Sequence, residues 1–475
     1  MESPIAHVVI LPFPAQGHIK PMLILAELLT QLAAFKITFL NNEHNHRRID
    51  KSAASRRRIN FISIPDGLPP DHPRTGSSVI DLFFTISTAS GPYLKNLIAS
   101  MSQPPTCIIC DGIMSFAIDL AAELGIPAIT FRTYSATCTW TYFHLQKLIQ
   151  NGEIPVLEGN EDMDKQISCI PGLENIMRRR DLPHICRLEP ENKVLQFYIT
   201  QTSKMTKASA LILNTFEELE SPIISHLKSI FPTIYTIGPL HTALKHNTID
   251  TTNGPYNSFS LIKTDKSGLE WLDSQKPNSV LYVSFGSVIS LSREQLMEFW
   301  YGLVNSGKLF LWAIRPDLVW DENESGQAPE ELKMGTRERG RIVGWVAQEE
   351  VLAHNAVGGF LTHSGWNSTL ESISFGKPMI CWPRIADQQV NSMCVSEMWK
   401  VGFDMKEICD RSTVEKLVRD LMEGRAEEIV KSTDEIARLA QGSVRDGGSS
   451  NRNIKKLIQD IKLLHSTNGA SRRST

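Results

Sequence analysis

Long apolar runs are missing from this chain of 475 residues, and no stretch approaches the roughly 18 residues that a membrane-spanning helix requires. Apolar segments such as residues 7–15 and 280–288 have the length of buried strands instead. The first residues also lack the basic segment and the small-residue cleavage site of a secretory signal. We therefore expect a cytoplasmic protein with no integral membrane segment.

An excess of one charge is missing as well. The chain carries 49 basic and 52 acidic side chains, which gives a net charge of −3. Because no basic field results, nucleic acids and anionic lipid surfaces are not expected as partners. With 41% hydrophobic and 21% charged residues, the composition is that of a globular protein with two large domains or three smaller ones.

Cysteine is scarce, since eight residues in a chain of this length are ordinary usage for a reducing compartment. Cys107 and Cys110 form a C-x-x-C pattern, but the pattern lies inside the apolar run CIIC. Residues three apart on a strand point to opposite faces, so this pair would be a poor metal or redox site. We expect both thiols to be buried in the core.

Several signatures of cofactor and metal sites are absent too. No G-x-G-x-x-G occurs, which disfavours an NAD-dependent dehydrogenase, and the P-loop and the G-x-S-x-G hydrolase turn are also missing. Asp162 and Asp164 form a D-x-D pattern, but it lies in a polar loop rather than at a strand end. His44 and His46 follow a predicted strand without further ligands clustered nearby. We therefore expect metal-free chemistry and no cofactor.

What the sequence does contain is an alternation of strand-length apolar runs and amphipathic helical patterns along its whole length. This alternation is typical of α/β domains with parallel sheets. The expected strands are residues 7–13, 36–40, 60–64, 106–110, 128–131, 211–214 and 233–237 in a first half, and 280–285, 309–314, 340–343, 357–362 and 379–382 in a second half.

The predicted fold class is α/β, with two doubly wound Rossmann-like domains that face a cleft. Residues 241–265 are the best linker candidate, because they are mostly polar and aperiodic. The expected boundaries are 1–240 for the first domain, 241–265 for the linker, 266–450 for the second domain, and 451–475 for a C-terminal helix with a frayed tail.

Two polar residues follow strands of the predicted first sheet, at the edge where ligands of such sheets bind. His18 falls near the start of the helix after the first strand, where amide dipoles favour the neutral imidazole that a general base needs. Asp111 directly follows the run CIIC and could orient that ring. The alternatives are a histidine that only bonds a turn, and an Asx-turn at Asp111-Gly112.

In the second half, the strand at 357–362 runs into His363-Ser364-Gly365 and then into a helix that starts at Trp366. A glycine-containing turn that opens a helix presents backbone N–H groups to an anion, so two phosphates could bind here with His363 as a further donor. Ser368 and Glu371 also fit a capping box, in which case Glu371 would only close the helix N-terminus.

The stretch Trp345–Gln388 resembles the signature box of plant UDP-sugar-dependent glycosyltransferases. The matching string is WVAQEEVLAHNAVGGFLTHSGWNSTLESISFGKPMICWPRIADQ, and further matches are PFPAQGHIKPM, CDGIMSFAIDLAAELGIP, WLDSQKPNSVLYVSFGS and FLWAIRPD. The resemblance covers nearly the whole chain. It implies a GT-B fold with an N-terminal acceptor domain, a C-terminal UDP-sugar domain, and last helices that cross back onto the first domain.

The resemblance also implies roles for individual residues. Trp345 would stack on uracil, the backbone at Val346 would contact the base, Gln348 would lie beside the base and ribose, and Glu371 would hold the ribose hydroxyls. The pyrophosphate would be bound by Ser287, His363, Asn367 and Ser368. The sugar hydroxyls would be read by Trp366, Asp387, Gln388 and Thr133. His18 would be the catalytic base and Asp111 its partner.

Two of these positions bear on the donor. Gln388 resembles the glucose-using members more than the galactose-using ones, and Trp366, rather than arginine, argues against glucuronic acid. The sequence departs from the usual pattern at Val346-Ala347, at Ser364 and at Arg384-Ile385. The last pair precedes the sugar-reading residues, so we expect it to reshape that end of the pocket modestly.

The implied activity is a metal-independent, inverting glucosyl transfer from UDP-glucose that forms a β-glucoside on a small apolar metabolite. The strings HSGWNSTLES, ADQQVNS and SEMWKVGFDMK resemble relatives that glucosylate terpenoid, iridoid or cyanogenic aglycones. Phenols and carboxyl groups stay open as acceptors, because the variable segments near Phe13, 83–92, 137–143 and 178–188 would set that choice. The alternatives are a non-catalytic nucleotide-sugar binder and transfer from another UDP-sugar. We expect a monomer.

Overall fold

The computed structural model describes residues 5–48, 58–74, 76–157, 161–247, 265–286, 289, 291–314, 336–423 and 427–471. The chain divides into two compact units. Unit 1 consists of Met1–Pro155, Leu188–Leu261 and Gln441–Thr475, and unit 2 of Val156–Arg187 and Ile262–Ala440.

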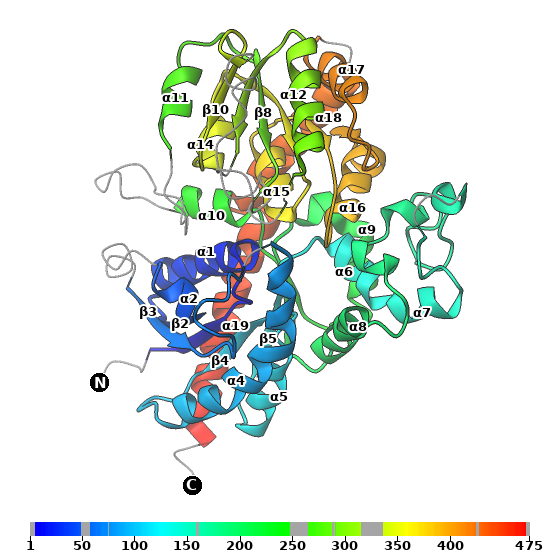
Figure 1. The fold of residues 1–475 in the computed structure, drawn as a ribbon. Helices are drawn as coiled ribbons and strands as arrows, with labels where there is room; N and C mark the ends of the chain where they lie inside the picture. The colour runs from blue at the N-terminus through cyan, green and yellow to red at the C-terminus, as the bar shows by residue number, and fades with distance from the viewer. Residues whose placement is uncertain are drawn as a thin grey trace. The chain divides into compact units, whose positions relative to one another are not determined.

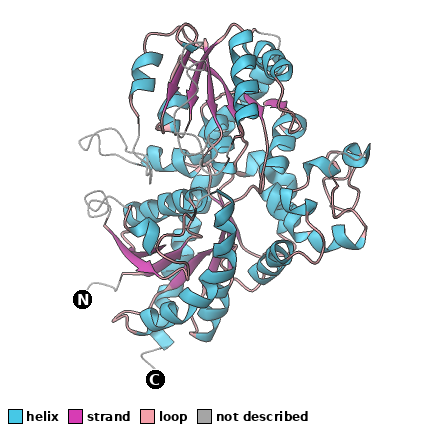
Figure 2. Cartoon of the chain, in the orientation of Figure 1, coloured by secondary structure: helices cyan, strands magenta, loops and turns pink. Residues whose placement is uncertain are grey.

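Unit 1 is built on a parallel sheet of seven strands in the order β3-β2-β1-β4-β5-β6-β7. Its strands are β1 (His7–Leu11), β2 (Lys36–Asn42), β3 (Ile59–Ile64), β4 (Cys107–Asp111), β5 (Ala128–Arg132), β6 (Ala210–Leu213) and β7 (Ile234–Thr236). The strands β1, β4, β5 and β6 are buried along their whole length, as expected where helices cover both faces of a parallel sheet. Figure 2 shows the strands of this unit flanked by helices.

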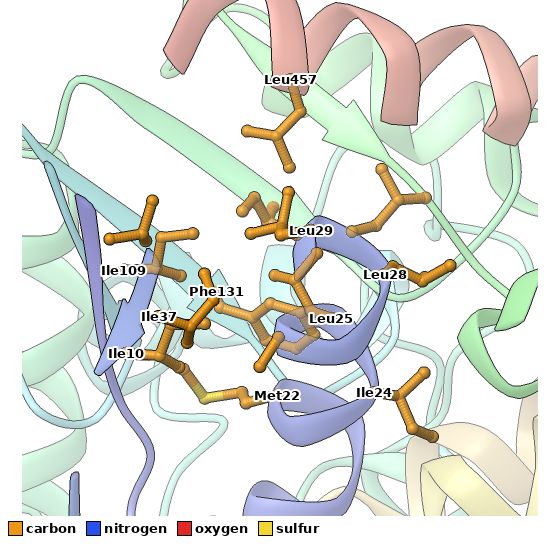
Figure 3. Close-up of a cluster of buried hydrophobic side chains, with 14 of the residues drawn as sticks. Ile10, Met22, Ile24, Leu25, Leu28, Leu29, Ile37, Ile109, Phe131 and Leu457 are labelled. Carbon is orange, nitrogen blue, oxygen red and sulfur yellow. The ribbon is translucent and has the colours of Figure 1, made fainter. Parts of the chain in front are cut away.

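The helices of unit 1 are α1 (Gln16–Ala33), α2 (Glu43–His46), α4 (Ile80–Ala99), α5 (Phe116–Glu123), α6 (Ala136–Phe143), α7 (Leu145–Gln150), α8 (Lys193–Met205), α9 (Glu217–Leu227), α10 (Leu240–Asn247) and α19 (Ser449–Ser471) (Figure 1). The largest core of the unit surrounds α1. Leu25 and Leu29 of this helix pack between the strand residues Ile10 and Ile109 and Leu457 of α19 (Figure 3).

Unit 2 contains a second parallel sheet, with six strands in the order β10-β9-β8-β11-β12-β13. Its strands are β8 (Val280–Ser284), β9 (Leu309–Ala313), β10 (Gly340–Val343), β11 (Val357–Thr362), β12 (Met379–Cys381) and β13 (Gly402–Asp404). Its helices are α11 (Ser267–Leu272), α12 (Arg293–Asn305), α14 (Gln348–Ala353), α15 (Trp366–Ser374), α16 (Gln388–Met393), a π-helix at Cys394–Met398, and α17 (Arg411–Met422). Helix α18 (Glu427–Val444) carries the chain from unit 2 back to unit 1.

The two parallel sheets confirm the predicted α/β fold class, and twelve of the strands lie where the sequence places them, with shifts of one or two residues at their ends. Strand β13 was not expected, because its three residues GFD are too short for a periodic pattern. Helix α1 begins at Gln16, so His18 is its third residue and Pro21 lies in its second turn. Cys107 and Cys110 are both buried free thiols, as expected.

Three segments of the expected domain division can be compared with the two units of the structure. Residues 241–247 of the expected linker belong to α10, whose Ala243 and Leu244 are buried in the core of unit 1, and residues 248–264 lie outside the described part of the chain. Residues 156–187 belong to unit 2, and residues 441–450 belong to unit 1.

Candidate active site

Both sheets reverse the direction of their strand order at one point, and ligands of doubly wound sheets bind at the carboxyl ends of the strands there. In unit 1 this point lies between β1 and β4. His18 follows β1, and Asp111 is the last residue of β4. In unit 2 the point lies between β8 and β11, which are followed by Gly286 and His363. The topology therefore supports a candidate site in each unit.

His18 and Asp111 are in contact in unit 1, although 93 residues separate them in the chain. Nδ1 of His18 lies 2.7 Å from Oδ2 of Asp111, and the aspartate side chain is 1% exposed against 14% for the histidine. A carboxylate only accepts hydrogen bonds, so Nδ1 carries the proton and donates it. The lone pair is then left on Nε2, which is the state of an imidazole that can act as a base.

The carboxylate of Asp111 is itself held by the backbone. Its Oδ1 accepts a hydrogen bond from the N–H of Ile113 at 3.1 Å, and its Oδ2 accepts one from the N–H of Phe13 at 3.4 Å. The bond to Ile113 is the Asx-turn that the sequence left open as the alternative for Asp111. One carboxylate thus closes the turn with one oxygen and orients the His18 ring with the other.

Thr133 adds a further contact to the same ring nitrogen. It follows β5 directly, its Oγ1 lies 3.0 Å from Nδ1 of His18, and it is buried. Because Nδ1 carries the proton, the Thr133 hydroxyl oxygen accepts a share of the hydrogen bond that Nδ1–H donates. This second contact helps to keep the His18 ring in one orientation.

A closed circuit of six rings contains His18, and we call it the aromatic cluster. It consists of His18, Phe13, Phe83, Tyr198, Tyr142 and Tyr134, with ring centres 5.3 to 6.0 Å apart between successive members and between Tyr134 and His18. The members come from two loops and from α1, α4, α6 and α8. This arrangement places apolar and aromatic surface directly beside the candidate base.

In unit 2, the turn between β11 and α15 is shaped around the ring of His363. A Cβ added to Gly286 would lie 2.6 Å from Cε1 of His363, and one added to Gly365 would lie 2.5 Å from its Nε2. Both positions therefore require glycine. Burial lowers the pKa of His363 to about 4, so at neutral pH the ring is an uncharged hydrogen-bond partner.

Helix α15 begins at Trp366, with Gly365 as its N-cap and without a side-chain cap. Ser368 is therefore the third helical residue, and a capping box between Ser368 and Glu371 is ruled out. The Nε2 amide of Gln348 instead donates to Oε2 of Glu371 at 2.7 Å and to Oγ of Ser368 at 2.8 Å. Tyr282 of β8 donates to Oε1 of Gln348 at 3.3 Å, which fixes the orientation of this amide.

Two further candidate residues lie at the N-terminus of α16, where Asp387 is the N-cap and Gln388 is the first helical residue. Asp387 is buried, and its Oδ2 accepts a hydrogen bond at 2.7 Å from the Asn391 amide, which also donates to the carbonyl of Ser364 at 2.9 Å. Oε1 of Gln388 accepts the backbone N–H groups of Arg384 and Ile385 at 2.9 and 3.0 Å. These two donors fix the orientation of the Gln388 amide. Its NH₂ group therefore points away from the N–H groups of Arg384 and Ile385.

The remaining candidates are placed as follows. Trp345 is half-buried and accepts the N–H of Asp265 on its backbone carbonyl at 2.6 Å, and Val346 after it is buried. Trp366 is buried with its ring centre 6.1 Å from that of Trp399, and Asn367 is half-buried in the first turn of α15. Ser287 lies outside the described residues.

Sequence reasoning missed three residues near His18. Tyr134 and Tyr198 belong to the aromatic cluster, and Arg132 stacks on it with its guanidinium carbon 4.5 Å from the Tyr134 ring centre. A charged residue that ends the apolar run AITF was an available signal for Arg132. Of the segments expected to set the acceptor, 178–188 lies mostly in unit 2, whereas Phe13, Phe83 and Tyr142 are members of the cluster.

The described residues show neither a metal centre nor a membrane span. No three His, Cys, Asp or Glu side chains gather there in a way that could hold a metal ion. Within the same residues, no helix combines the length and the apolar character needed to cross a bilayer. The D-x-D residues Asp162 and Asp164 are exposed and pair with Arg179, and with Arg178 and Arg180, respectively.

Known proteins resemble this chain over nearly its whole length. The family model described as UDP-glucoronosyl and UDP-glucosyl transferase matches residues 95–431. The 7-deoxyloganetic acid glucosyltransferase of Catharanthus roseus is 49% identical over 474 residues, which cover 96% of this chain and 98% of the relative. The 7-deoxyloganetin glucosyltransferase of Gardenia jasminoides is 42% identical over 472 residues, with coverage of 95% and 97%.

Among solved structures, UGT71G1 of Medicago truncatula, complexed with UDP-glucose, matches with a TM-score of 0.79 and 29% identity over 96% of this chain and 98% of that one. This match confirms the GT-B fold class, and the relatives confirm the resemblance carried by the signature box. The chain belongs to the UDP-glucuronosyl and UDP-glucosyl transferase family and is a plant-type UDP-glycosyltransferase.

Proposed function

We propose that this glucosyltransferase transfers glucose from UDP-glucose, with inversion, to a hydroxyl of a small apolar plant metabolite, and that its acceptor is an iridoid or related terpenoid aglycone. The observation that carries the proposal is the 2.7 Å contact between His18 and Asp111, which leaves Nε2 of His18 available beside the aromatic cluster. A non-catalytic nucleotide-sugar binder would not need this pair.

The donor contacts are those that the family resemblance implies. Trp345 stacks on the uracil, Val346 contacts the base through its backbone, and Gln348 and Glu371 bind the ribose. His363, Asn367, Ser368 and Ser287 bind the pyrophosphate, and Trp366, Asp387, Gln388 and Thr133 read the sugar. Support comes from the hydrogen-bonded network of Gln348, Ser368 and Glu371, which presents polar groups beside the N-terminus of α15.

The reaction is a single in-line displacement. Nε2 of His18 takes the proton from the acceptor hydroxyl while that oxygen forms a bond to the anomeric carbon of glucose. The bond from this carbon to the UDP oxygen breaks on the opposite face, and the electron pair leaves with UDP. Backbone N–H groups at the start of α15 and the uncharged His363 stabilise the charge that grows on the pyrophosphate. One displacement at an α-linked donor gives a β-glucoside.

The acceptor proposal rests on two supports. Relatives at 49% and 42% identity are named for 7-deoxyloganetic acid and 7-deoxyloganetin, which are iridoid aglycones. The aromatic cluster beside His18 supplies the surface that a small apolar alcohol would need. We further propose that the protein acts without a metal ion, in the cytoplasm and as a monomer, and that nucleic acid is not a partner.

The test is the release of UDP by the purified protein in the presence of EDTA, with UDP-glucose, UDP-galactose and UDP-glucuronic acid offered in parallel. The acceptor pool contains iridoid, terpenoid, phenolic and carboxylic compounds, and mass spectrometry identifies the products. We expect acceptor-dependent release that is strongest with UDP-glucose. Strongest release from another donor would contradict the donor assignment, and activity lost in EDTA but restored by a divalent ion would contradict the metal-free chemistry.

The His18→Ala variant separates an enzyme from a binder. We expect turnover to fall by about 10²- to 10⁴-fold while UDP-glucose still binds. His72→Ala is a matched control, because His72 also pairs with an aspartate, Asp81, at 3.0 Å but lies outside the aromatic cluster. Equal losses in both variants would contradict the role of His18 as the base.

A further inference from the structure

Arg132, the last residue of β5, is a buried cation, and no group in the described part of the chain forms a hydrogen bond with its guanidinium. The residue is 1% exposed, and Nε and both terminal nitrogens of its guanidinium have no partner among the described residues. Buried arginine is normally paired, because the five N–H donors of the guanidinium lose their water on burial and cannot lose the charge by deprotonation. An unpaired arginine at this depth is therefore an unusual feature of unit 1.

The groups around Arg132 attract the charge but leave its donors unused. The guanidinium carbon lies 4.5 Å from the Tyr134 ring centre and 5.0 Å from that of Tyr142, so both rings offer cation–π attraction. The nearby carboxylate of Asp111 uses Oδ2 for His18 and Oδ1 for the N–H of Ile113. None of these groups accepts a hydrogen bond from the guanidinium.

The backbone is adapted to this side chain. A Cβ added to Gly112 would lie 2.9 Å from Cδ of Arg132 and 3.2 Å from one of its terminal nitrogens. Glycine at 112 thus leaves the space that the arginine fills. This space adjoins the turn that carries Asp111, so the charge is placed close to the candidate catalytic pair.

A second unpaired polar group lies in the same cluster. The hydroxyl of Tyr142 is buried and has no hydrogen-bond partner among the described residues. Its ring contacts the guanidinium and also the Tyr134 ring, whose other neighbour in the aromatic cluster is His18. Two side chains with unused donors, the charged Arg132 and Tyr142, therefore both contact the Tyr134 ring, which in turn contacts His18.

We infer that Arg132 binds a carboxylate on the acceptor, with the Tyr142 hydroxyl as a second donor to the same group. A planar carboxylate matches the two parallel N–H groups of a guanidinium, and the pair would remove the cost of the unpaired buried charge. The inference rests on the proposed function, because it requires the aromatic cluster to be the acceptor site. It makes the acceptor a hydroxy acid whose hydroxyl, and not its carboxyl group, is glucosylated.

The first test is binding, which needs no turnover. Thermal unfolding is measured without donor, with 4-hydroxyphenylacetic acid, 3-hydroxycyclohexanecarboxylic acid and an iridoid acid aglycone, each beside its methyl ester. We expect at least one acid to raise the melting temperature of the wild type more than its ester does. Equal stabilisation by acid and ester across all three pairs, or none by any acid, would overturn the inference.

Variants then assign the effect to the arginine. In Arg132→Met we expect the selective stabilisation by the acid to disappear and the ratio of kcat/KM for acid over ester to fall by roughly tenfold or more. In Tyr142→Phe, which keeps the ring, we expect a smaller fall of the same ratio. An unchanged ratio in Arg132→Met, with the variant folded, would overturn the inference.

The stability of the free variants separates a ligand-binding arginine from a structural one. Because the guanidinium of Arg132 has no hydrogen-bond partner among the described residues, and methionine keeps an apolar contact with both tyrosine rings, Arg132→Met should lower the melting temperature of the ligand-free protein little or not at all. The matched control is Arg74→Met, since Arg74 is also buried in unit 1 but pairs with Asp66 at 2.7 Å, and its loss should lower the melting temperature. If Arg132→Met melts as early as the control, Arg132 is structural and the inference fails.

Failure of the inference is distinguishable from failure of the proposed function. Turnover of the esters without any preference for the acids would leave the glucosyl transfer intact and exclude the role of Arg132. Arginine-dependent stabilisation by the acids, without transfer to any acceptor, would support the role of Arg132 and exclude the proposed transfer. If the enzyme converts the acid into a glucose ester, the product has no free carboxyl group, and this result would also overturn the inference.

Discussion

At the scale of single residues, the proposed chemistry depends on which nitrogen of His18 carries a proton. Oδ2 of Asp111 accepts a hydrogen bond from Nδ1 at 2.7 Å, and that bond keeps the lone pair on Nε2. An amide at position 111 would be able to donate to Nδ1 and stabilise the opposite tautomer. The identity of one oxygen atom therefore decides whether the imidazole is a base.

For this reason we expect Asp111→Asn to lower kcat by about 10³- to 10⁴-fold while the protein stays folded. Asp119→Asn is the control, since Asp119 pairs with Lys204 at 2.8 Å on the surface of the same unit and is not part of the site. Steady-state rates with a fixed acceptor and saturating UDP-glucose measure both variants. A loss below tenfold in Asp111→Asn would show that this carboxylate does not set the tautomer.

Gly365 is a second position at which the addition of one atom would change the geometry of a proposed site. A Cβ there would lie 2.5 Å from Nε2 of His363, so Gly365→Ala must displace the ring or the turn. We expect the KM for UDP-glucose to rise by about tenfold or more, because the proposed pyrophosphate site loses its geometry. Gly442→Ala in α18 meets nothing within 4 Å and should leave KM unchanged. Equal KM values for the two variants would remove His363 from the donor site.

At the scale of elements, the short 3₁₀ helix Arg179–Asp181 of unit 2 ends in a buried carboxyl group, that of Asp181. Burial raises the pKa of Asp181 to about 7, with the neighbouring Asp404 acting in the same direction, while the N–H of Arg178 donates to its Oδ2 at 2.8 Å. In the unfolded chain this group titrates near its ordinary pKa of 3.8. The folded state therefore binds the proton more tightly.

It follows that the protonated carboxyl of Asp181 stabilises unit 2 fully at low pH, and that this contribution is lost as the pH rises from about 4 to about 7. We expect Asp181→Asn to flatten the decline in the free energy of unfolding over this range by up to about 1.4 kcal/mol per pH unit. Urea unfolding at pH 5, 6, 7 and 8 measures the slope. The same slope in wild type and variant would contradict the prediction.

The helices also show how much of the secondary structure a local sequence pattern predicts. The start of α15 at Trp366 was predicted, because glycine precedes an amphipathic run. Helix α10 was missed because its sequence LHTALKHN is polar, and its burial comes from packing against α1. Ser368 and Glu371 have the spacing of a capping box, yet they lie inside the helix, because the spacing alone does not say where a helix begins.

At the scale of the whole chain, the C-terminal helix α19 completes unit 1. Leu457 belongs to the core around α1 (Figure 3). On the same helix, Asp460 accepts a 2.6 Å hydrogen bond from the hydroxyl of Tyr235 on β7. Asn453 donates to Oγ1 of Thr236 at 2.8 Å on the same strand. Residues more than 200 positions apart thus share one core.

We expect Leu457→Ala to destabilise the protein by about 2–5 kcal/mol, because it leaves a cavity in a core that α1, the sheet and α19 build together. Leu463→Ala on the same helix is the control, since Leu463 is 55% exposed and should change stability by less than about 0.5 kcal/mol. Equilibrium unfolding in urea measures both. If the two variants are equally stable, α19 does not contribute to this core.

The sequence by itself determined the fold class, because a parallel strand in a covered sheet is a local apolar run and a covering helix is a local amphipathic pattern. It also determined the family, since the signature box is a contiguous string. Strand β13 was too short to be read in this way, and the 156–187 segment joins unit 2 through contacts that no local pattern encodes.

Only the tertiary structure decided which side chains meet. It brought His18 to Asp111 across 93 residues and placed Gly286 and Gly365 around the ring of His363. It also left Arg132 beside two tyrosines, with no acceptor for its guanidinium donors among the residues that the structure describes. Such contacts depend on the packing of elements that lie far apart in the chain. A sequence pattern carries the period of each element but not the distance between two of them, and that distance determines hydrogen bonding, burial and charge pairing.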